Sequence, residues 1–144
     1  MLEDYLYKDE RNNISKVVCK DKKNAKLAKL DYEVLSYNAV KDLTLIKVNL
    51  HTGRHHQIRV QLANFGHSIF GDQKYGKRGQ GKQIALWASE LTINHPISKE
   101  EITFKSIPEP IGTWSILKKS EKRQLALLTL LICFIEHYEN FMKM

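Results

Sequence analysis

The sequence predicts an α+β fold, with a mixed, mainly antiparallel sheet and few helices. Residues 30–37 and residues 43–50 both alternate apolar and polar side chains, and a short polar turn at Lys41-Asp42 separates the two runs. Alternation with a period of two is typical of strands that bury one face, and strands joined this closely pair antiparallel. These two runs therefore predict the centre of the sheet.

A helix is predicted over residues 55–65, where Ile58, Leu62 and Phe65 recur at helical spacing. Gly66 stands where such a helix would stop, because glycine enters the left-handed conformation without a side-chain clash. A Thr52-Gly53 turn separates the helix from the strand before it.

Further strands are predicted on both sides of this centre. Residues 14–19 form a short strand, and residues 20–29, with five lysines and one aspartate, form an exposed basic loop. Residues 84–93 predict a long buried strand, or a strand with a bend, that ends at Asn94-His95-Pro96. Residues around Ile102 and Phe104 give a last strand.

Composition indicates one soluble domain with a polyanionic partner. The chain has 144 residues, 42% hydrophobic and 27% charged, with a net charge of +7. Residues 1–83 hold 16 of the 23 Lys and Arg but only 9 of the 16 Asp and Glu. A basic half favours a nucleic acid, since each neutralised phosphate releases counterions. A solubilising lysine surface would explain the charge equally well.

The acidic start of the sequence and its two distant cysteines predict a cytoplasmic location. The start, Met1-Leu2-Glu3-Asp4, is acidic and does not resemble a signal peptide, and two distant cysteines suggest no disulfide. In the tail, residues 118–144, an apolar run from residue 125 to 135 predicts a helix that is too short to span a bilayer. That helix could pack on the domain, cover exposed sheet surface or mediate self-association. No membrane partner is expected.

The stretch from residue 50 to 76, LHTGRHHQIRVQLANFGHSIFGDQKYG, carries the most specific information. It closely resembles the Thr-Gly-Arg-x-His-Gln-Ile-Arg-Val-His-Leu-Ala…Gly-His-Pro-Ile…Gly-Asp…Tyr-Gly motif of the RluA-type RNA pseudouridine synthases. Gln61 stands where histidine is common and Ser68 where proline is common. Leu86-Trp87-Ala88 and His95-Pro96 match later parts of the family. The resemblance covers residues 1–117, a partial catalytic domain, and implies the C-terminal half of the synthase core.

The resemblance implies an isomerase that converts uridine to pseudouridine in rRNA or tRNA without a cofactor. Arg59 occupies the place of the arginine that pairs with the catalytic aspartate and keeps it ionised. Asp72 is expected in a structural turn that accepts backbone N–H groups. RNA-binding or site-supporting roles are expected for a further set, namely Arg54, His56, Gln57, Lys77 and Arg78.

The family's His-Arg-Leu-Asp-type element is not found in this sequence. We therefore expect a chain that begins partway through the catalytic domain and is inactive by itself. The alternative hypothesis is a non-catalytic RNA-binding or scaffold remnant of the family. A metal site is not predicted, because His51 and His55 lie across a glycine turn and no cysteine or acidic residue completes a set with them.

Overall fold

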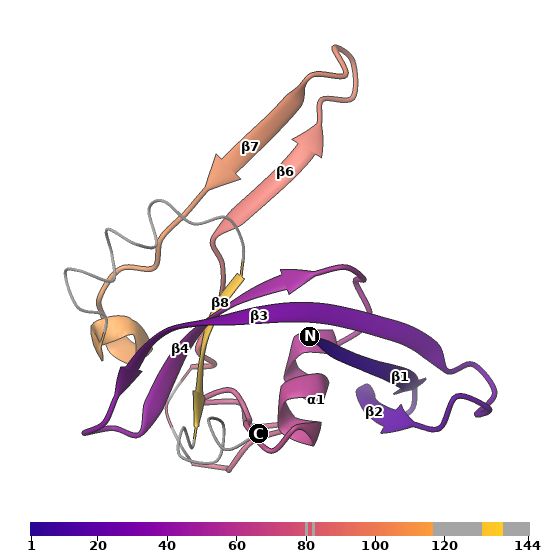
Figure 1. Cartoon of the computed structure of the whole chain (residues 1–144), viewed down its shortest axis with the longest axis horizontal. Coiled ribbons are helices and arrows are strands. Elements are labelled where there is room, and N and C mark those ends of the chain that lie inside the picture. Colours follow the sequence, from indigo (N-terminus) through magenta and orange to yellow (C-terminus); the bar gives the residue numbers. More distant parts are fainter. Residues whose placement is uncertain (80, 82, 117–130, 137–144) are drawn as a thin grey trace.

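Antiparallel strands dominate the computed structural model of the chain, which describes residues 1–79, 81, 83–116 and 131–136. In chain order the elements are β1 (Leu2–Asp9), β2 (Ile14–Val18), β3 (Lys26–Asn38), β4 (Leu43–Leu50), α1 (Gln57–Asn64), β5 (Leu86–Ala88), β6 (Glu90–Asn94), β7 (Glu101–Lys105), the 3₁₀ helix η1 (Gly112–Ile116) and β8 (Leu131–Glu136). A six-stranded sheet has the order β2-β1-β3-β4-β8-β5, and β6 and β7 form a separate hairpin that extends away from it (Figure 1). The predicted α+β class is confirmed.

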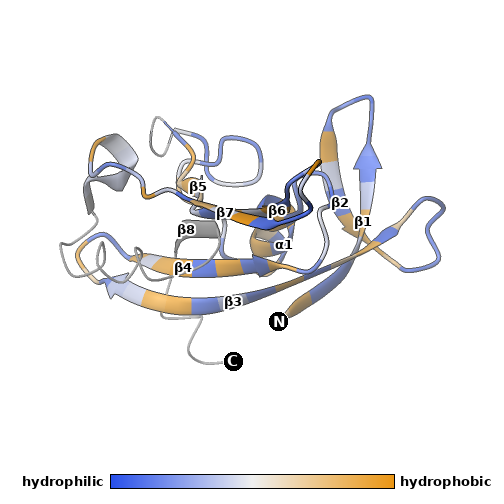
Figure 2. Ribbon diagram, turned by 90° about the horizontal axis from the view of Figure 1, so that it is seen from above, coloured by the Kyte–Doolittle hydropathy of each residue, from blue (hydrophilic) through white to orange (hydrophobic). Residues whose placement is uncertain are grey.

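The predicted pair at the centre of the sheet is confirmed as β3 and β4. They pair antiparallel from Leu30 opposite Leu50 to Asn38 opposite Leu43. Apolar and polar residues interleave along both strands (Figure 2). The basic loop predicted over residues 20–29 is wrong at residues 26–29, which begin β3. Residues 26–29 are part of the strand because β1 pairs with them, with Tyr5 opposite Leu27.

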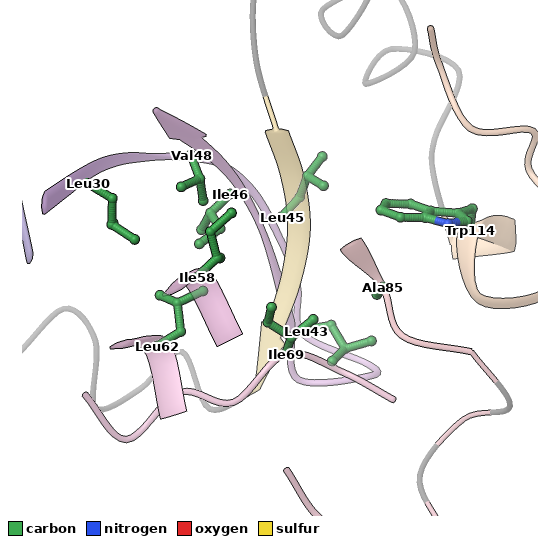
Figure 3. Packing of buried hydrophobic residues seen from close by; sticks show 10 residues of the cluster. All are labelled: Leu30, Leu43, Leu45, Ile46, Val48, Ile58, Leu62, Ile69, Ala85 and Trp114. Carbon is green, nitrogen blue, oxygen red and sulfur yellow. The ribbon is translucent and has the colours of Figure 1, made fainter. Parts of the chain in front are cut away.

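Helix α1 packs its apolar side on this pair of strands. Ile58 and Leu62 lie in one core cluster with Leu30, Ile46 and Val48 (Figure 3). The helix ends as predicted at Gly66, whose φ is 95°. The Gly66 N–H donates to the Ala63 carbonyl and the His67 N–H donates to the Leu62 carbonyl. This pattern is a Schellman cap.

The alternative of a strand with a bend over residues 84–93 agrees with the structure, in which β5 and β6 are separate. The predicted burial is wrong for β6, which is largely exposed, with Leu91 59% and Ile93 42% accessible. Leu91 and Ile93 share one face of the hairpin with Phe104, which is 55% accessible. The hairpin leaves the main sheet, so no second layer of described residues covers this face. Apolar residues predict a buried strand, but a strand is buried only where another part of the structure packs on it.

The helix predicted over residues 118–144 is wrong at residues 131–136, which form β8. This strand pairs with β4 on one side and β5 on the other. A short apolar run does not distinguish helix from strand, and its β-branched and aromatic residues favour a strand. The other residues of that prediction, 118–130 and 137–144, lie outside the described part. Self-association through an apolar helix is therefore not supported.

No helix in the described part of the chain is long and apolar enough to cross a membrane.

Candidate functional site

A buried ion pair joins α1 to the loop that follows it. Arg59 on α1 donates from Nε to Asp72 Oδ2 and from Nη2 to Asp72 Oδ1, each at 2.8 Å. The Asp72 side chain is fully buried and that of Arg59 is 22% exposed. Two parallel charge-assisted bonds fix the plane and direction of the guanidinium.

The backbone around Asp72 is shaped to present this carboxylate. Gly71 has a φ of 76°, and a Cβ at that position would clash with the Gln83 carbonyl. After the turn, the N–H groups of Lys74 and Tyr75 donate to Asp72 Oδ1 at 2.9 and 3.0 Å. The turn predicted from the sequence, in which Asp72 accepts backbone N–H groups, is thus confirmed.

The electrostatics of the pair keep both groups charged. Burial by itself would raise the pKa of Asp72, but the hydrogen bonds from Arg59 and from the backbone outweigh it and lower that pKa. The hydrogen bond to Asp72 raises the pKa of Arg59 further above its ordinary value. Arg59 therefore remains a fixed cation at neutral pH.

One edge of Arg59 stays open. Its guanidinium carbon lies 5.0 Å from the centre of the Tyr75 ring, so an aromatic face covers one side. Nε and Nη2 bind Asp72, whereas Nη1 has no partner among the described residues. The sequence suggested only an aspartate outside the motif as the partner of Arg59. Reasoning from the sequence missed Asp72, although it is the one carboxylate within residues 50–76.

His56, a predicted site residue, belongs to a hydrogen-bonded chain beside this pair. The Ser15 backbone N–H donates to the Tyr75 hydroxyl at 2.7 Å, and that hydroxyl lies 2.9 Å from His56 Nδ1. Since the Tyr75 oxygen accepts from Ser15, its own hydrogen is available to His56 Nδ1. Burial, then the nearby charge of Arg59, lowers the pKa of His56 to about 4. A neutral His56 fits its role as acceptor.

Gln57 and Arg54 hold the turn that leads into α1. Gln57 Oε1 accepts from the Thr52 hydroxyl at 2.8 Å and from the Arg54 N–H at 2.9 Å, and Gln57 Nε2 donates to the Lys29 carbonyl. These bonds hold the turn in place. Arg54 Nε donates to the Leu27 carbonyl. The turn is thereby tied to the start of β3.

Helix α1 begins at Gln57 rather than at the predicted His55. His56 has a left-handed φ of 53°, which is incompatible with a helical position. The turn bonds described above therefore delay the helix by two residues.

Lys77 and Arg78, the remaining predicted residues, are exposed in the loop after Tyr75. Within the described residues, no group of three or more His, Cys, Asp or Glu is arranged to hold a metal ion.

Comparison with known proteins gives a consistent set of matches. The sequence profile of the family described as RNA pseudouridylate synthase matches residues 2–64. The dual-specificity RNA pseudouridine synthase RluA of Haemophilus ducreyi is 37% identical over 103 residues, which cover 69% of this chain and 45% of that protein. An uncharacterized RNA pseudouridine synthase of Aquifex aeolicus is 37% identical over 99 residues, covering 62% of this chain and 31% of that protein.

RluA of Escherichia coli is 35% identical over 101 residues, covering 68% of this chain and 45% of that protein. The chain thus spans less than half the length of these relatives. No solved structure gives a significant match.

Proposed function

Because the chain belongs to the RluA-type RNA pseudouridine synthase family, we propose that it is the arginine-bearing part of an isomerase that converts uridine to pseudouridine in rRNA or tRNA. In this proposal the nucleophilic carboxylate comes from a segment outside this sequence, and the chain is inactive without it. Its substrate is structured RNA, no cofactor takes part, and it works in the cytoplasm.

The observation that carries the proposal is the fixed pose of Arg59. Asp72 holds Nε and Nη2, Tyr75 covers one face, and Nη1 remains available. A second carboxylate placed at Nη1 would meet a cation that is already oriented. Such a carboxylate has a lowered pKa and stays ionised at neutral pH, as a nucleophile must.

Asp72 is unsuited to be the nucleophile itself. Its side chain is fully buried, Oδ2 accepts from Arg59, and Oδ1 accepts from Arg59 and from two backbone N–H groups. A fully buried carboxylate that is held by four hydrogen bonds is not accessible to a substrate. Asp72 therefore positions Arg59.

The reaction determines what should be measured. The target nucleotide leaves the base stack, its bond from the sugar to the ring nitrogen breaks, and the sugar rejoins the ring at carbon 5. The hydrogen on carbon 5 then leaves to solvent as a proton. RNA carrying tritium at that carbon therefore releases tritium to water once per product formed.

The test compares this chain alone with a fusion. In the fusion, this chain replaces the matching region of RluA from Escherichia coli, and intact RluA serves as the positive control. The fusion is expected to release tritium from a mixed rRNA and tRNA substrate, whereas the chain alone releases none. Tritium release by the chain alone would contradict the proposal that the nucleophile lies outside this sequence. A folded but inactive fusion that still binds RNA would favour the alternative hypothesis, a non-catalytic RNA-binding remnant.

A further inference from the structure

The molecule has a polar cleft whose lining does not include Arg59. It has a volume of about 430 Å³ and lies between the β1–β2 hairpin and the turn before α1. This volume falls within the range of roughly 300–1,000 Å³ that is usual for small-ligand sites. Lys8, Lys26, Arg54, His55 and Ser15 are among the residues that line it. The proposed catalytic role of Arg59 makes no use of this cleft.

The hydrogen bonds of His55 determine which ring nitrogen a ligand can use. The Ser15 hydroxyl donates to the His55 carbonyl at 2.7 Å, and the same oxygen lies 2.9 Å from His55 Nδ1. A serine hydroxyl has one hydrogen, so Nδ1 must carry the proton and donate to Ser15. In the neutral ring, Nε2 is then an acceptor, and no described residue forms a hydrogen bond with it.

The ring position is well defined by its surroundings. The Ser15 residue is 2% accessible, so its hydroxyl is a fixed anchor for Nδ1. The His55 and His56 rings lie 3.8 Å apart at 30°, close to a stacked arrangement. Burial and the neighbouring lysines Lys8 and Lys74 lower the pKa of His55, which keeps the ring neutral at physiological pH.

Two cations of the cleft are free to meet a phosphate. Arg54 uses Nε for the Leu27 carbonyl, which leaves its two terminal nitrogens, and no described carboxylate pairs with it. Lys26 likewise has no ion-pair partner in the described part of the chain. Lys8, by contrast, is paired with Glu10 at 3.1 Å. Besides the paired Lys8 and Glu10, the cleft therefore offers the cations Arg54 and Lys26 and the neutral acceptor His55 Nε2.

We propose that this cleft binds one ribonucleotide unit of an RNA strand, with Arg54 and Lys26 on its phosphate and His55 Nε2 accepting a hydrogen bond from its 2′-hydroxyl. A 2′-hydroxyl is the donor that distinguishes RNA from DNA. The inference rests on the proposed function in so far as the partner is RNA. It assigns the cleft and His55, which stands at the unspecified position of the family motif.

The direct test measures binding of one oligonucleotide in three chemistries. The probe is a fluorescein-labelled single strand of about 10 nucleotides, a length typical of single-strand sites, made as RNA, as DNA and as 2′-O-methyl RNA. The methylated strand keeps an RNA-like sugar but cannot donate. The full chain is expected to bind RNA roughly three- to ten-fold more tightly than either analogue, the usual effect of one hydrogen bond.

Two substitutions separate Nε2 from the structural role of the ring. His55→Asn retains an N–H near the place of Nδ1 and lacks Nε2, so the preference for RNA over 2′-O-methyl RNA should fall to about one-fold. His55→Gln restores an acceptor near the place of Nε2 and should recover most of the preference. Equal losses in both variants, or equal binding of RNA and 2′-O-methyl RNA by the unaltered chain, would overturn the proposal.

The phosphate contacts have their own readout. Lys26→Gln should reduce the slope of log affinity against log salt by roughly 0.7, the effect of one phosphate contact on a single strand. Lys41→Gln, at the exposed β3–β4 turn, is the matched control and should leave the slope unchanged. An unchanged slope for Lys26→Gln would contradict the phosphate assignment.

The two proposals fail in different ways. If the chain binds no oligonucleotide, the cleft proposal fails and the RNA partner itself is in doubt. If the chain binds RNA and its analogues alike, only the cleft proposal fails, because tritium release by the fusion is measured independently.

Discussion

Asp72 and Arg59 show how single residues build the site. The Asp72 carboxylate accepts hydrogen bonds from Arg59 and from the turn that follows. Because the charge is paired and hydrogen-bonded, burying it costs little free energy. Arg59 gains an orientation that an exposed arginine would lack. At this scale the important property is the fixed direction of the cation, because positive charge is abundant elsewhere on residues 1–83.

Asp72→Asn should lower the free energy of unfolding at neutral pH by about 2 to 3 kcal/mol, because it leaves the Arg59 charge without its anion. Urea denaturation measures the change. Asp31→Asn, which alters an exposed ion pair, is the control and should change stability by no more than about 1 kcal/mol.

The sign of the pH effect follows from the lowered pKa of Asp72. The stability it contributes is present above the pKa of an unfolded aspartate, about 3.9, and is lost as the pH falls through the lower folded-state value. The difference in unfolding free energy between wild type and Asp72→Asn should therefore become smaller at low pH. A gap of constant size at low pH would contradict the pairing.

His56 should make the fold sensitive to mild acid. Its pKa is lowered to about 4 in the folded chain, against roughly 6.5 when unfolded. Between these values the unfolded chain binds a proton that the folded chain does not, so stability falls as the pH drops from about 6.5 to 4. His56→Asn should weaken this dependence, and asparagine tolerates the left-handed φ of 53°. Urea denaturation midpoints of both proteins at several pH values test this prediction. The same pH dependence of stability in His56→Asn as in the wild type would refute it.

Elements with a regular pattern were predictable, and those set by tertiary pairing were not. The alternation of residues 43–50 and the stop at Gly66 agree with the structure, because both depend on local geometry. The β-branched and aromatic residues of β8 favour a strand, but its pairing with β4 and β5 is a tertiary contact that the local sequence does not show. The Arg59–Asp72 pair depends on the turn at Gly71, whose direction cannot be read from the residue types alone.

Two leucines should show how differently α1 and the β6–β7 hairpin contribute to stability. Leu62 on α1 is fully buried, so Leu62→Ala should cost about 2 to 5 kcal/mol of unfolding free energy. Leu91 on β6 is 59% accessible, and Leu91→Ala should cost less than about 1 kcal/mol. Chemical denaturation of both variants compares them directly. A similar large loss for Leu91→Ala would mean that the hairpin packs against another part of the chain.

The strand β8 can be tested through its backbone. Ile132 lies opposite Lys47 of β4 and Trp87 of β5, so its N–H belongs to an interior ladder. Ile132→Pro should remove that donor and destabilise the fold by about 3 kcal/mol. Amide hydrogen exchange should become faster in β4 as well. Unchanged protection of β4 would show that it does not pair with residues 131–136.

At the scale of the whole molecule, the excess positive charge and the two polar sites lie in the same part of the chain. Residues 1–83 carry the excess positive charge, the Arg59 pair and the cleft beside His55. The remaining residues supply the β6–β7 hairpin and the strands at one end of the sheet. A basic part that contains both polar sites supports an RNA partner for this surface. Since the chain spans less than half of its relatives, catalysis is a property we assign to a larger assembly.

The most direct measurement of the central claim uses the fusion with two residues changed together. Arg59→Gln with Asp72→Asn replaces the ion pair by a neutral hydrogen-bonded pair of similar shape, so the fold should keep most of its stability. If Arg59 orients and ionises the nucleophile, tritium release should fall by at least about a hundredfold, with RNA affinity nearly unchanged. Tritium release at the rate of the unaltered fusion would contradict a role for Arg59 in the reaction.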